Sequence, residues 1–243
     1  MSKLEAASRV WYTVQCMAVL YVAATPIGNR EDITLRALRV LGQEVAVIFC
    51  EDTRVTKKLL SAYKIHTPLR SLHARSSENK IRDAIRFLDE GSSVAYVTDA
   101  GSPGISDPGA ALVRAARAAG HGVRAVPGPS ALTAALSISG IADPVFVFYG
   151  FLPHKKGRST LLREIAASAR TAVLYESPHR IKKTLASLAT LCPHKRVVVA
   201  RELTKLFEEV LEGTAEEILS LMEADTRHVR GEFVVMVEKV RGG

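Results

Sequence analysis

Residues 96–109 read YVTDAGSPGISDPG and begin inside the apolar run SVAYVT at 93–98. A short apolar run of this kind is typical of a buried strand, and the glycines and prolines after it predict a tight turn. Gly101 and Gly104 have no Cβ atom, so the main chain there can approach a ligand closely. Asp99 would place a carboxylate beside the exposed N–H groups of the turn. The stretch therefore predicts a strand that ends at a ligand-binding turn, as in open α/β sheets.

The same alternation of apolar runs and amphipathic stretches fills the first half of the chain. Strands are expected at 18–24, 45–50, 93–98 and 122–126, and helices at 32–41, 53–63, 79–89 and 108–119. Asp32 and Asp107 are the expected N-caps of the first and last of these helices. This βαβα order predicts a mostly parallel sheet covered by helices.

The segment PGPSALTAALSISG at 127–140 predicts a rigid turn followed by a helix, and we expect the domain boundary there. Beyond it, strands are expected at 144–151, 171–176, 196–203, 207–214 and 231–240, and helices at 158–169, 178–190 and 214–224. The last two strands are expected to be neighbours around helix 214–224, which opens with a capping box of Thr214 and Glu217. The predicted fold is thus a two-domain α/β protein with a mostly parallel first sheet and a mixed second sheet. Its predicted parts are an N-terminal extension 1–16, a first domain 17–127 and a second domain 128–243.

Composition excludes several classes of protein. The chain has 243 residues and only three cysteines, Cys16, Cys50 and Cys192, which are widely spaced and form no CxxC motif. A disulfide framework or metal site is therefore not expected, and a reducing cytoplasm is the simplest location. Cys50 is expected to be a small core residue. No apolar run is long enough to cross a bilayer, so we expect no membrane association.

The net charge of +8 is concentrated in one part of the chain. Between Pro153 and Lys205, twelve lysines and arginines face three glutamates. A polyanionic partner such as nucleic acid would explain this concentration, and solvated helix faces would explain it equally well. Aromatic content of 6% argues against a stacking platform for single strands.

Polar or tightly turning residues follow five of the expected strands: TPIGN at 25–29, EDTR at 51–54, TDAGSPG at 98–104, YGFLP at 149–153 and YESPHR at 175–180. The set suits a small zwitterion or a ligand that contains ribose. No P-loop, GxGxxG, nucleophile elbow or HExxH motif occurs, so phosphate-loop, dinucleotide, serine-hydrolase and zinc chemistry are not indicated.

Eight ordered blocks carry a resemblance: LYVAATPIGN, EDTRVTKKLL, YVTDAGSPGISDPG, PGPSA, GFLPHKKGR, LYESPHR, RELTK and GEFVVMVEK. Over about residues 17–240 the chain resembles the ribosomal RNA small subunit methyltransferase I family of the tetrapyrrole methylase superfamily. The resemblance implies two α/β domains with S-adenosylmethionine in a cleft between them, and a homodimer. It also implies 2′-O-methylation of a ribose in 16S ribosomal RNA of the small subunit, at a cytidine of the decoding region.

The resemblance also implies site residues. The implied cofactor contacts are Pro26, Asp99, Ala100, Gly101, Ile105, Ser106, Ser130, Ala131, Tyr175, Ala200 and Arg201. Glu176, Asp52 and Asp99 are the candidate general bases, with Glu176 preferred because it ends a strand near arginines. The alternative for Glu176 is a structural role, as the partner of a neighbouring arginine or as a helix cap. The alternative for Asp52 is local pairing with Arg54. The candidate RNA contacts are Arg54, Lys155, Lys156, Arg158, Arg180, Lys182 and Lys183, and His154 and His179 could contact phosphate too.

Two other functions stay open at this point. One is a methyltransferase of the same fold that acts on a tetrapyrrole or on another RNA, although a porphyrin-type substrate would not need so basic a segment. The other is a non-catalytic RNA-binding factor in ribosome assembly. Cofactor binding would separate the second from the enzymes.

Overall fold

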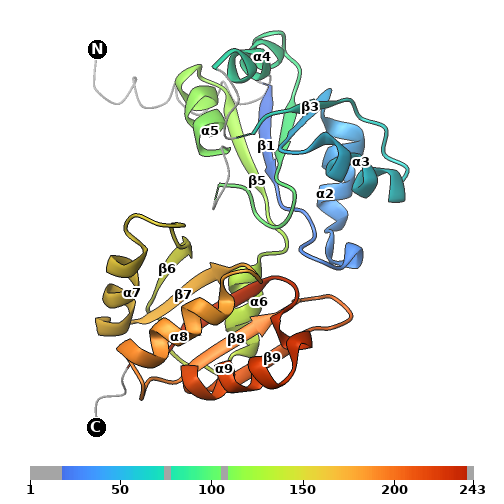
Figure 1. The fold of residues 1–243 in the computed structure, drawn as a ribbon. Helices are drawn as coiled ribbons and strands as arrows, with labels where there is room; N and C mark the ends of the chain where they lie inside the picture. The colour runs from blue at the N-terminus through green and yellow to red at the C-terminus, as the bar shows by residue number, and fades with distance from the viewer. Residues whose placement is uncertain (1–17, 74–77, 105–108, 240–243) are drawn as a thin grey trace, which may run out of the picture. The chain divides into compact units, whose positions relative to one another are not determined.

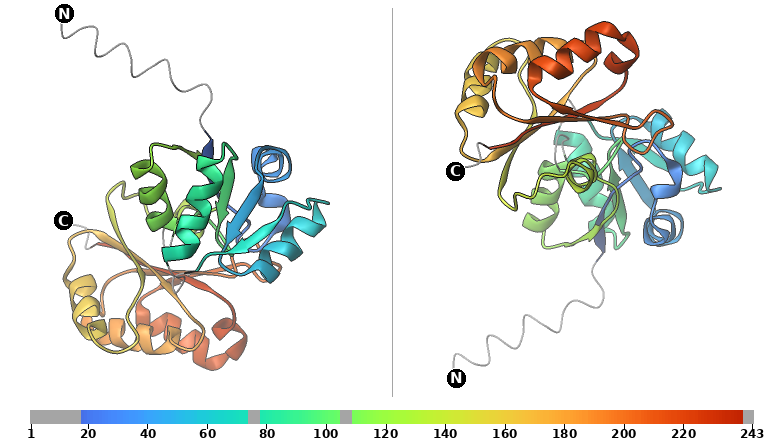
Figure 2. Two further views of the ribbon diagram at one scale, coloured as in Figure 1. Left: turned by 90° about the horizontal axis from the view of Figure 1, so that it is seen from above. Right: turned by 90° about the horizontal axis from the view of Figure 1, so that it is seen from below.

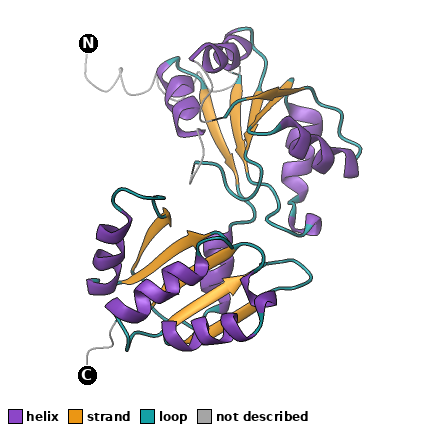
Figure 3. Cartoon of the chain, in the orientation of Figure 1, coloured by secondary structure: helices purple, strands orange, loops and turns teal. Residues whose placement is uncertain are grey.

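The computed structural model describes residues 18–73, 78–104 and 109–239, and these form two compact units that divide between Ser130 and Ala131. Each unit is built on one five-stranded sheet flanked by helices (Figure 1, Figure 3). The predicted boundary after residue 127 lies slightly earlier than this division. The two-unit α/β architecture with one parallel and one mixed sheet confirms the predicted fold class.

The first sheet has the order β3-β2-β4-β1-β5, and every pairing in it is parallel. Its strands are β1 (Val19–Ala23), β2 (Val47–Cys50), β3 (Leu69–Ser71), β4 (Val94–Val97) and β5 (Gly122–Val126). The residues of β2 and β4 are buried throughout, as expected for central parallel strands covered on both faces. All five strands run in one direction, so their carboxyl ends share one edge of the sheet.

Two hydrophobic clusters cover the two faces of the first sheet. One joins alternate residues of β1 and β2 to the helices α2 and α3, and the other joins the remaining alternate residues to α4 and α5. Figure 2 shows helices on both sides of this sheet. The helical segments of this unit are η2 (Arg30–Asp32), α2 (Leu35–Arg39), the π-helical turn η3 (Val40–Glu44), α3 (Thr53–Ala62), α4 (Glu78–Asp89) and α5 (Gly109–Ala118).

One prediction for the first unit was wrong, and one strand was not predicted. The expected single helix 32–41 is broken, because the Thr34 hydroxyl accepts from Ala37 N and starts α2 there, whereas Asp32 closes the short η2. The edge strand β3 was missed, because it has only three residues and none of them is buried. The predicted cap Asp107 lies outside the described residues.

The second sheet has the order β6-β7-β10-β8-β9. Only β6 and β7 are parallel; β10 runs antiparallel to both β7 and β8, and β9 is antiparallel to β8. Its strands are β6 (Phe146–Phe151), β7 (Thr171–Glu176), β8 (Val197–Arg201), β9 (Glu209–Gly213) and β10 (Phe233–Val237). The expectation that the last two strands are neighbours was wrong. β8 lies between them because β9 turns back onto β8, which leaves the other side of β8 for β10.

The helices of the second unit are α6 (Ala131–Ile138), α7 (Arg158–Ala167), α8 (Ile181–Leu191), α9 (Ala215–Ala224) and the short η4 (Thr226–Val229). One cluster packs α7, α8 and α9 on a single face of the sheet, against alternate residues of β7, β8 and β10. The predicted capping box of α9 is confirmed, since the Thr214 and Glu217 side chains each accept from the other's main-chain N–H. α6 contacts β10 and contributes nothing to that cluster.

Cys50 and Cys192, the two cysteines in the described part of the chain, are free and buried, and burial raises the pKa of both thiols. Cys50 ends β2 inside the core, as predicted. Within 18–73, 78–104 and 109–239, no helix has the length and apolar character needed to cross a membrane. Those same ranges hold no group of three metal-ligating side chains.

Candidate active site

Two turns at the carboxyl edge of the first sheet are joined by main-chain hydrogen bonds. Thr25 N donates to Gly101 O and Gly101 N donates to Thr25 O, each at 3.0 Å. The Thr25 hydroxyl donates to Thr98 O at 3.0 Å, and Thr25 is buried. The turn after β1 and the turn after β4 are therefore held side by side at the carboxyl edge of the sheet.

The second of these turns needs glycine for conformational reasons. Gly101 has φ +81° and Gly104 has φ +90°, the left-handed region that favours glycine. A Cβ atom on Gly101 would lie 3.4 Å from Ile27 Cγ2 and 3.9 Å from Pro129 O, whereas one on Gly104 would meet nothing within 4 Å. Backbone conformation therefore favours glycine at both positions, and the predicted close approach to a ligand stays a prediction.

Acidic side chains from two strands lie beside this turn. Asp99 is exposed, and its Oδ1 accepts from Asp52 N at 3.0 Å. The Thr98 hydroxyl donates to the Glu51 carboxylate. The ends of β2 and β4 are therefore linked, and the Asp99 carboxylate stays accessible at the edge of the sheet.

Asp52 is committed to the start of α3. Its carboxylate accepts from Arg54 N at 2.8 Å and forms an ion pair with the Arg54 guanidinium at 2.6 Å. The side-chain hydrogen bond from Arg54 makes the largest contribution and the main-chain bond the next, and together they lower the pKa of Asp52 to about 2. A carboxylate this acidic is a weak proton acceptor, since efficient general bases have pKa values near the working pH. The local pairing with Arg54 therefore counts against Asp52 as the base.

The segment after β5 joins the same edge. Ala24 N donates to Val126 O at 3.1 Å, and the Ser102 hydroxyl donates to Pro129 O at 3.1 Å. The predicted contacts Pro26, Asp99, Ala100, Gly101 and Ser130 all belong to these connected turns. Ala131 is the first residue of α6, and Ile105 and Ser106 lie outside the described residues.

The predicted contacts of the second unit divide between the two faces of its sheet. Val234 of β10 is paired with both Tyr175 and Ala200, so these three residues share one face. Arg201 is paired with Phe233 and therefore lies on the helix-covered face. Its guanidinium donates to Glu209 at 2.8 Å and to Arg230 O at 3.3 Å. These contacts count against a cofactor contact by the Arg201 side chain.

Glu176 also lies on the helix-covered face, and its side chain is fully buried. It forms ion pairs with Arg180 at 2.7 Å and with Arg158 at 3.4 Å, and it accepts from the Thr184 hydroxyl at 2.6 Å. A general base must reach the proton it removes, and this carboxylate has no exposed surface. The structural alternative, pairing with an arginine, is thus favoured over the preferred catalytic role. The same contacts occupy Arg158, which is buried, and they count against its predicted contact with RNA.

The remaining basic candidates differ in their accessibility. Lys155, Lys156 and Lys183 are exposed, whereas Arg180 is occupied by Glu176 and by Leu152 O at 2.7 Å. Lys182 lines a hollow formed by Pro178, His179, Lys182, Thr226, Val229, Arg230 and Gly231. Arg230 was missed by sequence reasoning, because it lies far along the chain in a loop without a motif. The hollow has three basic side chains and no acidic one.

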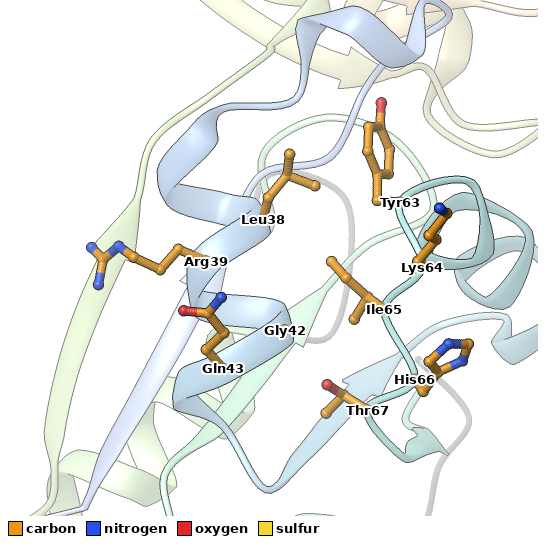
Figure 4. A pocket seen from close by; sticks show the side chains of 9 residues that line it. All are labelled: Leu38, Arg39, Gly42, Gln43, Tyr63, Lys64, Ile65, His66 and Thr67. Atoms are coloured by element: carbon orange, nitrogen blue, oxygen red, sulfur yellow. The ribbon is translucent and has the colours of Figure 1, made fainter.

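A second hollow lies in the first unit between η3 and the segment after α3 (Figure 4). Its lining includes Arg39, Lys64 and His66, and Arg39 forms an ion pair with Glu44. It contains no predicted site residue. It is therefore a suitable control for the basic hollow of the second unit, because both hollows are lined by basic side chains.

Comparison with known proteins agrees with this architecture. The sequence profile of the Tetrapyrrole (Corrin/Porphyrin) Methylases family matches residues 19–219. The cobalamin biosynthetic enzyme cobalt precorrin-4 methyltransferase has a similar structure, with a TM-score of 0.68 and 19% identity over 90% of this chain and 94% of that one. The chain belongs to the tetrapyrrole methylase family.

Sequence relatives narrow the assignment. Ribosomal RNA small subunit methyltransferase I of Xylella fastidiosa is 48% identical over 90% of this chain and 81% of its own length. The protein of the same name from Thermotoga maritima is 45% identical over 85% of this chain and 93% of its own. Within the tetrapyrrole methylases, the chain thus falls in the ribosomal RNA small subunit methyltransferase I family. A uroporphyrin-III C-methyltransferase from Thermus thermophilus, solved with S-adenyl homocysteine, shares only the fold, at 20% identity, a TM-score of 0.60 and coverage of 92% of this chain and 98% of that one.

Proposed function

We propose that this chain transfers a methyl group from S-adenosylmethionine to a ribose 2′-oxygen of small-subunit 16S ribosomal RNA, at a cytidine of the decoding region. The observation that carries the proposal is identity of 42–48% over most of the chain to ribosomal RNA small subunit methyltransferase I proteins. Exposed lysines in the second unit are a further support, because phosphate contacts supply much of the affinity for nucleic acid.

The carboxyl edge of the first sheet fits S-adenosylmethionine. The exposed Asp99 carboxylate, whose Oδ1 accepts from Asp52 N, can also accept from a hydroxyl or amine of the ligand, and glycine at 101 adds no side chain to the turn. Pro26, Ala100 and Ser130 lie on the turns bonded to it. When bound there, the cofactor would supply a methyl group on a positively charged sulfur. Tyr175 and Ala200 stay predicted contacts from the second unit.

Methylation of a ribose hydroxyl releases its proton, and a base within hydrogen-bond reach would accelerate the step about 10²–10⁴-fold. Asp99 is the candidate that the contacts leave available, since Asp52 is held by Arg54 and Glu176 is buried. Asp99→Asn should slow single-turnover methyl transfer at saturating cofactor far more than Asp52→Asn. Equal rates in the two variants would remove Asp99 from this role.

RNA is proposed to contact Lys155, Lys156 and Lys183, together with the basic hollow that contains Lys182 and Arg230. Such contacts position a nucleic acid and make its binding dependent on salt, without reading sequence. A homodimer in the cytoplasm is also proposed. Leu206 and Phe207, which are 90% and 67% exposed, are candidates for its interface. Light scattering of Leu206→Glu would test the dimer, and an unchanged mass would exclude this loop.

One assay separates the candidate functions. Labelled methyl groups are offered through S-adenosylmethionine to small ribosomal subunits, to free 16S ribosomal RNA and to a uroporphyrinogen-type substrate. Transfer to ribosomal RNA at a ribose, mapped against cells that lack the protein, is the expected result. Transfer to the tetrapyrrole alone would overturn the proposal, and the absence of both cofactor binding and transfer would favour an assembly factor.

A further inference from the structure

We propose that Glu176 is a positioning residue that fixes the loop 153–157, and through it the exposed Lys155 and Lys156. Both carboxylate oxygens are used. Oε1 accepts from Ser177 N at 2.9 Å and from Arg180 Nε at 2.7 Å. Oε2 accepts from the Thr184 hydroxyl at 2.6 Å and from Arg158 at 3.4 Å. A buried carboxylate with donors on both oxygens holds its partners in fixed positions.

The two arginines connect this carboxylate to both ends of the loop. Arg180 donates through Nη1 to Leu152 O at 2.7 Å, and Leu152 is the residue before the loop. Arg158 is the residue after it and the first residue of α7. Gly157 completes the turn with φ +88°, and Arg158 N donates to Lys155 O at 3.3 Å. One buried group thus fixes where the loop begins and where it ends.

The placement of the arginines is not explained by helix stability. Arg158 begins α7 and Arg180 is the N-cap of α8, and neither helix has a side-chain N-cap hydrogen bond. A cation at a helix N-terminus is opposed by the helix dipole. Glu176 offsets that repulsion, so the arrangement is understandable as a means of holding the loop.

The consequence for RNA rests on the function proposed above, but the consequence for the loop does not. Two measurements therefore test the inference separately. The first is hydrogen exchange of the amides at 154–157 in Glu176→Gln, with Glu238→Gln as the matched control. Glu238 is a buried carboxylate of the same unit, and it is paired with Arg196 at 3.0 Å. Loop exchange should rise about tenfold or more in Glu176→Gln, equivalent to roughly 1.4 kcal/mol of local opening. It should stay unchanged in Glu238→Gln.

The second measurement is a double-mutant cycle on binding of a decoding-region RNA fragment. Lys155→Ala with Lys156→Ala is made in the wild type, in Glu176→Gln and in Glu238→Gln. If Glu176 positions the lysines, the fold loss of RNA affinity on removing them should be at least about threefold smaller in the Glu176→Gln background than in the wild type. In Glu238→Gln the loss should equal that in the wild type.

Two results would overturn the inference. One is that removal of the lysines weakens RNA binding equally in the Glu176→Gln and Glu238→Gln backgrounds. The other is unchanged hydrogen exchange of the loop in a folded Glu176→Gln protein. If the lysines do not affect RNA binding in the wild type while loop exchange still responds to Glu176, the RNA proposal fails and the positioning role stands. Should Glu176→Gln fail to fold, Arg180→Lys keeps the buried charge balanced. The lysine has one nitrogen, whereas the guanidinium of Arg180 bonds Glu176 through Nε and Leu152 O through Nη1. We therefore expect faster hydrogen exchange of the loop in Arg180→Lys too.

Discussion

The carboxyl edge of the first sheet and the end of β7 in the second unit are both strand ends with acidic residues, yet they are built differently. At the first, main-chain groups of Thr25 and Gly101 bond to each other, and Asp99 stays exposed. At the second, the Glu176 carboxylate is enclosed by two guanidinium groups and a hydroxyl. We therefore propose ligand binding for the exposed Asp99 and an architectural role for the enclosed Glu176.

The largest expected effect is on stability at the end of β7. Glu176→Leu leaves the buried Arg158 and the largely buried Arg180 without their counter-ion and should cost about 3–5 kcal/mol in the free energy of unfolding, measured in urea. Replacing all three residues by Leu or Met should recover much of that loss, because an apolar cluster needs no charge balance. A single variant within about 1 kcal/mol of wild type would show that the network is not critical.

The next effect tests whether the joined turns at the carboxyl edge of the first sheet contribute to cofactor binding. Gly101→Val and Gly104→Val impose similar backbone strain, of about 1–2 kcal/mol, because both positions have positive φ. Only Gly101 is bonded to Thr25 and packed by Ile27, so only its variant should weaken S-adenosylmethionine binding in calorimetry, by about tenfold or more. Equal weakening by the two variants would mean that general strain, and not the joined turns, explains the loss.

A smaller effect compares the two hollows. Lys182→Ala with Arg230→Ala removes two cations from the hollow of the second unit, and Arg39→Ala with Lys64→Ala does the same in the hollow of the first. The first pair should lower the salt slope of RNA binding by about 1.4, or about 0.7 for each lost phosphate contact. The second pair should leave the slope unchanged. If only the substitutions at Arg39 and Lys64 lowered the salt slope, the RNA-binding surface would instead be assigned to the first unit.

The smallest effect concerns acid stability. Bonds from Arg227 lower the pKa of Asp225 to about 2, whereas an unfolded aspartate titrates near 3.9. The contribution of Asp225 is therefore present above about pH 4 and is lost as the pH falls toward 2. Asp225→Asn should be slightly less stable than wild type at pH 6, and urea titrations should converge near pH 2. A difference that persists at pH 2 would point to a cause other than this carboxylate.

Much of the fold was predictable because its signals are local. The buried parallel strands are short apolar runs, and the helix at 214–224 has both members of its capping box. The edge strand β3 has no such signal, since Leu69–Ser71 is too short and too exposed to show a period. The insertion of β8 between β9 and β10 depends on pairings across more than thirty residues, from Arg201 to Phe233, which a local pattern does not contain.

The candidate site follows the same division. The turn at 98–104 was predicted because glycine and proline report backbone conformation directly. The preferred role of Glu176 was not supported, because its partners come from positions 158, 180 and 184 and their convergence depends on packing. Arg230 could not be found from its neighbours in sequence, since its place beside His179 and Lys182 follows from the strand order.

The short Pro127–Pro129 segment determines how the protein should be dissected. Its flanking bonds, from Ala24 to Val126 and from Ser102 to Pro129, attach it to the first unit. Cutting the gene at codon 127 would leave an N-terminal fragment without the acceptor for Ser102, with one wall of the carboxyl edge of its sheet missing. A cut after Ser130 keeps that wall, so fragment complementation should succeed there and fail three codons earlier.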